Sequence, residues 1–306
     1  MSDTRSPLPL WERAERAKRD RGEGKSSNWK NRTRPFSLPH MPHVLEPSLE
    51  RRLFSEAPGR AQFFHAGITA ALDLLFPPHC AACDTPLFSD GNRCICHDCA
   101  ARLTWIGLDR CARCGDRTGL GSGVMSDCPA CRTHPPAHVK TSCTLMKFGD
   151  GSARDLLLSL KFGGKLHLAK LYGDLLAARV RATDMFAPDL LVVPAPVTGK
   201  TLRTRTFNQA EEIAGCLARR LNLRLESRLL KKIRHTEPQA KLSLEKRREN
   251  LKGAFACDAR RAARYKGARV LLVDDVITTG STISECARTL VAAGISEVRA
   301  AAVARA

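Results

Sequence analysis

The sequence has no long hydrophobic run. None of its stretches approaches the roughly 18 uninterrupted apolar residues that a membrane-spanning helix needs, and the best candidate, residues 66–76, is short and carries Asp73. The N-terminal residues also lack an apolar segment followed by a small-residue cleavage site, which a secretory signal would have. We therefore expect no membrane span and a cytoplasmic location.

Aromatic side chains are also scarce, at 5% of the 306 residues. A stacking platform for single-stranded nucleic acid needs several exposed rings, so any contact with DNA would be mainly electrostatic. Basic charge is available for such a contact, because residues 144–306 hold 30 of the 50 Lys and Arg but only 16 of the 31 Asp and Glu. This charge favours small polyphosphates or nucleic acid as ligands, and a solvated basic face explains it equally well.

The length corresponds to about two average domains, and 43% apolar residues suffice for a sizeable core. The first 60 residues hold seven of the 17 prolines, which predicts a disordered basic extension over 1–60, with Met41 as an alternative start. A cysteine-rich segment over 61–143 and a larger domain over 144–306 follow. In the larger domain, helical patterns alternate with short apolar strands, as in doubly wound folds. The predicted helices cover 152–162, 166–182, 209–221 and 281–293.

The sequence contains thirteen cysteines. In a reducing compartment their thiols are not expected to form disulfides, so another use is needed to explain them. Eight of them form four C-x-x-C pairs: Cys80/Cys83, Cys96/Cys99, Cys111/Cys114 and Cys128/Cys131. Each pair presents two thiolates on a tight knuckle, and two knuckles make a closed tetrahedral site for structural zinc. We therefore predict two zinc ions that supply much of this segment's folding free energy. Redox-active dithiols or an iron–sulfur cluster are the alternatives.

The pairing of the four knuckles is a separate question. We favour sequential pairing, the first with the second and the third with the fourth. Interleaved pairing is the alternative, which the spacing leaves open.

A candidate phosphate site follows a predicted strand. Residues 270–273 form a short apolar run that is typical of a buried parallel strand, and Asp274 and Asp275 end it. Ligands of open α/β sheets bind at the carboxyl ends of strands, where two carboxylates can accept hydrogen bonds from vicinal hydroxyls or help to hold a hard cation. A loop of small hydroxyl side chains follows and opens a helix: Thr278, Thr279, Gly280, Ser281 and Thr282. Backbone N–H groups of such a loop can cradle a phosphate. Alternatively, the acids only cap the turn and the hydroxyl residues only start the helix.

The D-D-V-I-T-T-G-S-T sequence over 274–282 resembles the phosphoribosyl pyrophosphate signature of the type I phosphoribosyltransferases. Other motifs precede it: V-P-A-P over 193–196, F-N-Q-A over 207–210, T-x-P-Q over 236–239 and R-x-x-N-x-x-G-A-F over 247–255. With the four cysteine pairs, and in this order, they resemble the ComF family of competence-associated phosphoribosyltransferase-like proteins over about residues 66–306. One position departs from the family, which has glycine where this chain has Thr206. A β-branched residue is costly there if the turn needs a positive φ.

The resemblance implies an α/β fold: a five-stranded parallel sheet flanked by helices and preceded by a small double zinc ribbon with four cysteine ligands at each zinc site. It implies that phosphoribosyl pyrophosphate binds with Mg²⁺, the ribose hydroxyls at the acid pair and the 5-phosphate at the 278–282 loop. The candidates for the pyrophosphate loop are Pro194, Ala195, Pro196, Arg203, Arg205 and Lys241. The resemblance also implies a role in DNA uptake, DNA utilisation or natural transformation.

Two classes of function stay open. In the first, the protein is a transferase in which a nucleophile attacks C1 of phosphoribosyl pyrophosphate, with an acceptor and catalytic residues that the sequence does not identify. In the second, it is a non-catalytic adaptor that holds single-stranded DNA and docks a DNA-uptake helicase, with a regulatory or vestigial pocket. Segment 228–252, which has nine basic residues against three acidic ones, would then contact DNA. The intact acid pair favours the first class, because a pure DNA binder does not need it.

Overall fold

The computed structural model describes residues 77–87, 94–107, 109–118, 123–133, 135–149, 151–236 and 244–306. The predicted extension over 1–60 and the alternative start at Met41 lie outside these residues, and so does Lys241. Within the described part of the chain, none of the helices is long and apolar enough to cross a membrane.

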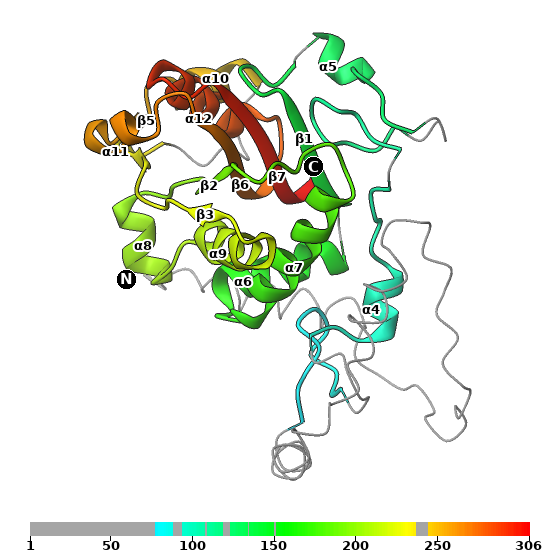
Figure 1. The fold of residues 1–306 in the computed structure, drawn as a ribbon. Coiled ribbons are helices and arrows are strands. Elements are labelled where there is room, and N and C mark those ends of the chain that lie inside the picture. The colour runs from blue at the N-terminus through cyan, green and yellow to red at the C-terminus, as the bar shows by residue number, and fades with distance from the viewer. Residues whose placement is uncertain are drawn as a thin grey trace, which may run out of the picture. The chain divides into compact units, whose positions relative to one another are not determined.

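A five-stranded sheet in which all strands run parallel organises residues 141–306 (Figure 1). In the order β1-β7-β6-β2-β3, the strands span Thr141–Lys147 (β1), Glu297–Arg305 (β7), Arg269–Ile277 (β6), Leu191–Pro194 (β2) and Arg224–Leu225 (β3). Strand β1 thus begins in the last three residues of the predicted segment 61–143. The inner strands consist largely of buried apolar residues, as a parallel sheet covered on both faces requires. The expected fold class is confirmed.

Strand β6 is longer than the sequence predicts. The apolar run ends at Val273, but the strand stays paired with β7 as far as Ile277, so both acids lie within it. Side chains of a strand alternate between its two faces. Asp274 therefore follows Leu272 on one face, and Asp275 follows Val273 on the other.

Helices cover both faces of the sheet. One face packs against α6 (Ser152–Phe162), α7 (His167–Arg181) and α9 (Gln209–Leu221), and the other packs against α12 (Ser281–Ala292). All four are predicted from the sequence with bounds within one residue. The remaining elements of this part are α8 (Gly199–Arg205), α10 (Leu244–Leu251), α11 (Ala259–Arg264) and the antiparallel pair β4 (Leu230–Lys232) and β5 (Phe255–Cys257).

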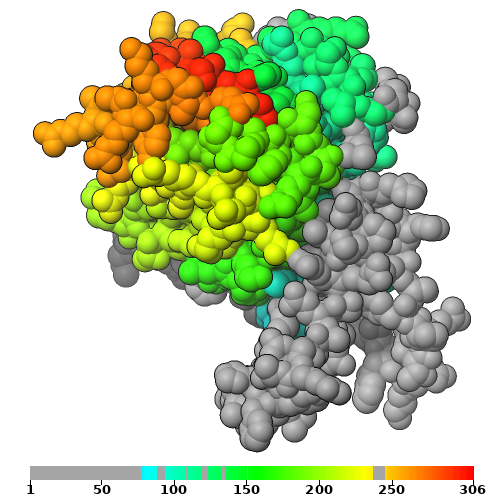
Figure 2. All heavy atoms as spheres, viewed as in Figure 1, coloured from blue at the N-terminus to red at the C-terminus, as the bar shows by residue number. Residues whose placement is uncertain are grey.

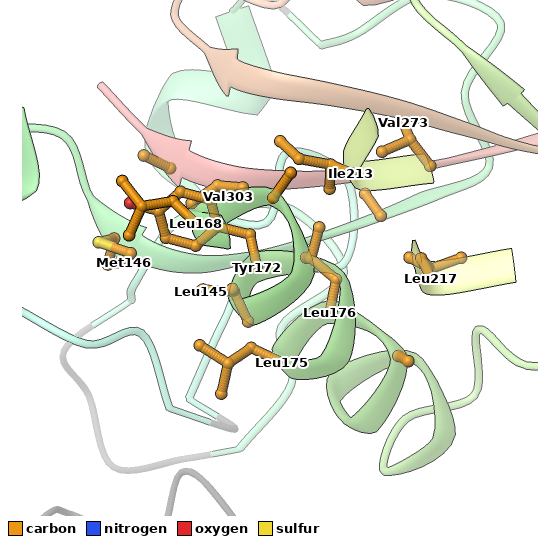
Figure 3. Packing of buried hydrophobic residues seen from close by; sticks show 14 of the residues in the cluster. Leu145, Met146, Leu168, Tyr172, Leu175, Leu176, Ile213, Leu217, Val273 and Val303 are labelled. Atoms are coloured by element: carbon orange, nitrogen blue, oxygen red, sulfur yellow. The ribbon is translucent and has the colours of Figure 1, made fainter. Parts of the chain in front are cut away.

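The alternation of strand residues divides the core in two. Val273 of β6 and Val303 of β7 belong to the cluster under α7 and α9, with Tyr172 and Ile213 from those helices (Figure 3). Val270 and Leu272 belong to the cluster under α12. Full burial of one such side chain stabilises the fold by roughly 1.5–3 kcal/mol. On the face drawn in Figure 2, the red of the last residues occupies only a small area, in keeping with the burial of β7.

The cysteine-rich residues have little regular structure. Within the described ranges between residues 77 and 133 they form turns, isolated bridges and two short helices, α4 (His97–Ala101) and α5 (Pro129–Thr133). Their apolar residues share a core cluster with α6 and α7, whereas the second set of four cysteines forms a buried cluster of its own. A segment built in this way depends on metal and on its neighbour for stability.

Candidate ligand site and cysteine clusters

The 278–282 loop connects β6 with α12, and its central residue has a left-handed backbone. Gly280 is the N-cap of α12, with a φ of 78° and a ψ of 0°. A Cβ at this position would lie 3.8 Å from Pro136, which is an ordinary contact. Glycine is therefore favoured by the positive φ and not by lack of space.

Two hydroxyl groups converge beside this glycine. Thr279 Oγ1 lies 2.8 Å from Ser281 Oγ, and the Ser281 N–H donates to Thr279 Oγ1 at 3.4 Å. The N-cap residue, Gly280, has no side chain with which to cap the first turn of α12. The first turn of this 12-residue helix and the two hydroxyls therefore form a place where an anion is favoured.

The acid pair lies at the carboxyl end of β6, next to this loop. Asp275 Oδ2 lies 2.7 Å from Lys161 Nζ of α6, and the Asp275 N–H donates to Asp274 Oδ1 at 2.8 Å. Loss of solvent, and then the charge of Asp275, raise the pKa of Asp274 to about 8. The pair thus favours a ligand that brings a cation or hydroxyl donors.

Two lysines near the acids are missing from the predicted site. Lys161 is the penultimate residue of α6 and forms an ion pair with Asp275. Lys232 of β4 donates to Thr236 Oγ1 at 2.9 Å; burial lowers its pKa, and the charge of Asp274 opposes that shift. The sequence places Lys232 only in the basic segment, and a lysine near the end of a helix, such as Lys161, is common without any role in a site. Only the folded sheet shows that both lysines lie near the acids.

The 194–196 segment lies beside the acid pair. The Ala195 N–H donates to the Val273 carbonyl at 2.8 Å, and Asn208 Nδ2 donates to the Ala195 carbonyl at 3.0 Å. Asn208 is also the N-cap of α9 and accepts from the Ala210 N–H. This double use gives a physical reason for the F-N-Q-A motif, because its asparagine fixes the V-P-A-P segment against β6.

The arginines predicted for the pyrophosphate loop are less closely associated with the acid pair than Lys161 is. Arg203 and Arg205 both lie on α8, and the Arg205 guanidinium stacks 4.6 Å above the ring of Phe162. Phe162 follows Lys161, so Arg205 lies at the edge of the site, away from the acids' own contacts.

Thr206 departs from the family's glycine, and the turn does have the positive φ at which a β-branched residue is costly. Thr206 follows α8 with a φ of 64°, and its N–H donates to the Leu202 carbonyl at 2.8 Å, which closes the helix. A β-branched residue thus occupies a left-handed C-cap, where glycine is the usual choice.

The eight paired cysteines gather into two clusters in sequence order, which confirms sequential pairing. Cys80, Cys83, Cys96 and Cys99 form the first, and Cys111, Cys114, Cys128 and Cys131 form the second; within each, the sulfurs lie within 4.8 Å of one another. The second is wholly buried, whereas Cys83 of the first is exposed.

The sulfur spacing fits tetrahedral zinc. Cys83 and Cys96 lie 3.6 Å apart, Cys114 and Cys128 lie 3.7 Å apart, and Cys111 and Cys131 lie 3.8 Å apart. Zn–S bonds of about 2.3 Å in a tetrahedron give sulfur separations of about 3.8 Å. Backbone N–H groups also donate to Cys80 and Cys111 sulfurs at 3.3 Å, which stabilises thiolates. With four sulfur ligands and no open position, these are structural sites.

A double zinc ribbon and a phosphoribosyltransferase-like α/β domain together define the class of this protein. Family models agree: a double zinc ribbon domain matches residues 71–132, and a phosphoribosyl transferase domain matches residues 208–306. The chain belongs to the ComF family of competence and DNA-utilisation proteins.

Similarity to curated relatives supports this family assignment. The chain is 31% identical over 233 residues to DNA utilization protein YhgH of Salmonella typhi, which covers 74% of this chain and 96% of that protein. It is 32% identical over 154 residues to Competence protein F of Haemophilus influenzae, covering 49% and 67%. Among solved structures, a B. subtilis glutamine phosphoribosylpyrophosphate amidotransferase complexed with ADP and GMP matches 45% of this chain and 26% of that one, at 20% identity and a TM-score of 0.31.

Proposed function

We propose that the chain binds phosphoribosyl pyrophosphate with Mg²⁺ at the end of β6 and acts in DNA uptake or utilisation. The observation that carries the ligand assignment is the acid pair, held by Lys161, directly before a hydroxyl-rich loop at the start of α12. The names of the relatives, Competence protein F and DNA utilization protein, support the biological role.

Each part of the site has a task in this proposal. Asp274 and Asp275 accept hydrogen bonds from the ribose hydroxyls, and residues 278–282 hold the 5-phosphate through N–H groups and hydroxyls. The segment 194–196, fixed by Asn208, faces the pyrophosphate. Mg²⁺ binds mainly through substrate oxygens and water, and it would neutralise the pyrophosphate as that group leaves. The carboxylates suit this hard cation, since oxygen atoms are its preferred ligands.

The test is isothermal calorimetry with phosphoribosyl pyrophosphate and Mg²⁺. We expect Asp275→Asn to weaken binding about ten- to hundredfold, because loss of a hydrogen bond to a charged group costs roughly 1.5–3 kcal/mol. Asp174→Asn is the matched control: Asp174 also pairs with a lysine, Lys170, at 3.0 Å, but it lies on α7, away from the loop. No heat of binding at millimolar ligand, or equal affinities of the two variants, would contradict the proposal.

We further propose that the two cysteine clusters hold one structural zinc ion each. The closed sulfur sets and their spacing support this assignment. Zinc has no catalytic part in the proposal, because four thiolates leave no position for water or substrate.

The second candidate function is an adaptor that holds single-stranded DNA on its basic surface. The net charge of +19 favours it. Part of segment 228–252 is already engaged in the fold, however. Lys231 pairs with Asp258 at 2.9 Å, and Arg234 donates to the carbonyls of Asn250 and Lys252 at 2.9 Å. DNA contact would therefore fall to other exposed basic residues of the segment, such as Arg228 and Arg248.

A further inference from the structure

Phe162, the last residue of α6, presents an aromatic ring to solvent beside the acid pair. The residue is 67% exposed. The preceding residue, Lys161, forms the 2.7 Å ion pair with Asp275, so the end of α6 lies at the carboxyl end of β6. Consecutive residues of a helix point about 100° apart, which places the ring next to the lysine and not beneath it. The ring therefore borders the site without taking part in the contacts of the acids.

An arginine covers one face of this ring. The Arg205 guanidinium lies 4.6 Å from the centroid of the Phe162 ring, and Arg205 is the last residue of α8. Because Phe162 keeps two thirds of its surface exposed, the opposite face of the ring is open to a ligand. Aromatic rings and guanidinium planes are the groups on which unpaired nucleobases stack in proteins.

The turn after the ring leaves the space beside it free. Gly163 ends α6 and donates to the Ser159 carbonyl at 2.9 Å, and a Cβ at this position would lie 2.7 Å from the same oxygen. Gly164 follows with a φ of 62°, and a Cβ there would meet none of the described residues within 4 Å. The chain thus turns tightly after Phe162 and places no side chain at either position.

The helix that carries Arg205 is basic and exposed. Besides Arg205, α8 contains Lys200 and Arg203, and it has no acidic residue and no buried one. Lys200 and Arg203 are both exposed. A base stacked on Phe162 brings a sugar and, in a strand, phosphates, which these two side chains can meet. The surroundings therefore favour the base of a nucleotide over an aromatic side chain of a protein, which brings no negative charge.

We propose that the exposed face of Phe162, with the Arg205 guanidinium on the opposite face, is a stacking site for a nucleobase next to the sugar-phosphate site. A free nucleoside and a base of single-stranded DNA offer the same planar ring to this site. The position of the base beside a phosphoribosyl group rests on the proposed function; the stacking site itself does not. Because every base has a π-face, we expect little preference among bases.

The fluorescence of 2-aminopurine tests the site, because this base loses fluorescence when it stacks. The full chain is titrated into two probes, the free nucleoside and a short single strand of thymidines with one central 2-aminopurine. We expect Phe162→Ala to weaken binding about ten- to hundredfold, the loss of one base–aromatic stack. Phe162→Tyr keeps the ring and should retain the affinity of the parent. Phe162→Leu keeps only apolar surface and should bind as weakly as Phe162→Ala.

Phe186→Ala is the matched control. Phe186 is also exposed and lies under an arginine, Arg181, at 5.5 Å. Its neighbour Met185 accepts a hydrogen bond from Arg299 near the start of β7, so Phe186 lies at the opposite edge of the sheet from the acids. This variant should bind the probes as the parent does. Equal losses in Phe162→Ala and Phe186→Ala, or no stacking of either probe by the parent, would overturn the proposal.

Calorimetry with phosphoribosyl pyrophosphate and Mg²⁺ separates this inference from the proposed function. Phe162→Ala should keep the affinity of the parent for that ligand, because Phe162 makes none of the contacts assigned to the ribose or the phosphates. If phosphoribosyl pyrophosphate binds and neither probe stacks, the stacking site is wrong and the proposed function stands. If a probe stacks on Phe162 and phosphoribosyl pyrophosphate does not bind, the proposed function is wrong and the stacking site stands. Stacking of the strand alone identifies DNA as the source of the base, and stacking of the nucleoside shows that a free base suffices.

Discussion

At the scale of single residues, two positions of the site work against the stability of the empty protein. Thr206 adopts a backbone conformation that suits glycine, and Asp274 buries a carboxyl group beside a second one. A buried carboxyl group such as that of Asp274 is typical of a ligand site, where replacing it stabilises the protein at a cost in function. Thr206 stands where the family has glycine, so its strain is not required by the site.

Thr206→Gly is expected to stabilise the protein by about 1 kcal/mol, because it removes the strain of a β-branched residue at φ 64°. The free energy of unfolding in urea is the measurement. Thr204→Gly is the control: Thr204 lies inside α8 two residues earlier, where glycine should destabilise by roughly 0.3 kcal/mol, the difference between the helix propensities of threonine and glycine. Changes of the same sign in both variants would mean that strain at Thr206 is negligible.

Asp274→Asn should stabilise the ligand-free protein, more strongly as the pH rises. With a folded-state pKa of about 8, Asp274 keeps its proton between about pH 4 and pH 8, while the unfolded chain loses it. The folded state then binds the extra proton, so stability of the parent falls across this window. Asparagine carries no charge, so the variant does not lose this stability as the pH rises.

Unfolding in urea at several pH values checks this expectation. Asp189→Asn should behave in the opposite way, because the hydrogen bond from Arg269 lowers the pKa of Asp189. That group contributes stability above its unfolded-state pKa, and the contribution disappears as the pH falls through the folded-state pKa. An advantage of Asp274→Asn that is constant with pH, or largest near pH 4, would contradict the assignment.

At the scale of elements, the long helices are predictable and the short ones are not. Helices α6 and α9 have the predicted bounds, because 11 and 13 residues contain enough turns to display an apolar face. Helix α8 has seven residues and no buried one, so no hydrophobic pattern marks it. Strand β6 outruns its apolar sequence because its equally long neighbour β7 continues the hydrogen-bond ladder past the acids.

The candidate site was predictable only where it is contiguous in sequence. The acids and the loop after them form one motif, as do the cysteine knuckles. Lys161, Lys232 and Arg305 come from three other elements, and no local pattern indicates that the topology brings them to the end of β6.

The ribbon should contain two equivalents of zinc per chain, one in each closed set of four sulfurs. Elemental analysis of protein purified without added metal measures this directly. Cys128→Ser should reduce the content to one equivalent, whereas Cys143→Ser should leave it at two, because Cys143 is a buried cysteine of β1 outside both clusters. A content of zero or one in the parent, or an iron chromophore, would contradict the zinc assignment.

At the scale of the whole molecule, the basic charge should make binding of single-stranded DNA strongly dependent on salt. Affinity should fall by roughly 0.7 log units per log unit of salt for each neutralised phosphate, with little sequence preference. Replacing the exposed Arg228 and Arg248 with alanine should lower that slope, whereas Thr279→Ala should not change it. Fluorescence anisotropy over a salt series is the measurement. No salt-sensitive binding at low ionic strength would remove the electrostatic basis of the adaptor.

The pairing of β1 with β7 also sets an order of events during synthesis. Thr141 lies opposite Arg299, so β1 has to wait for more than half of the chain before its partner leaves the ribosome. The eight clustered cysteines all lie between residues 80 and 131, and their knuckles can take up metal long before that. Residues 112–115 of the ribbon bond to β1, so a folded ribbon can hold β1 in place for the last strand. Shortage of zinc during translation should therefore appear as slow or failed closure of the sheet.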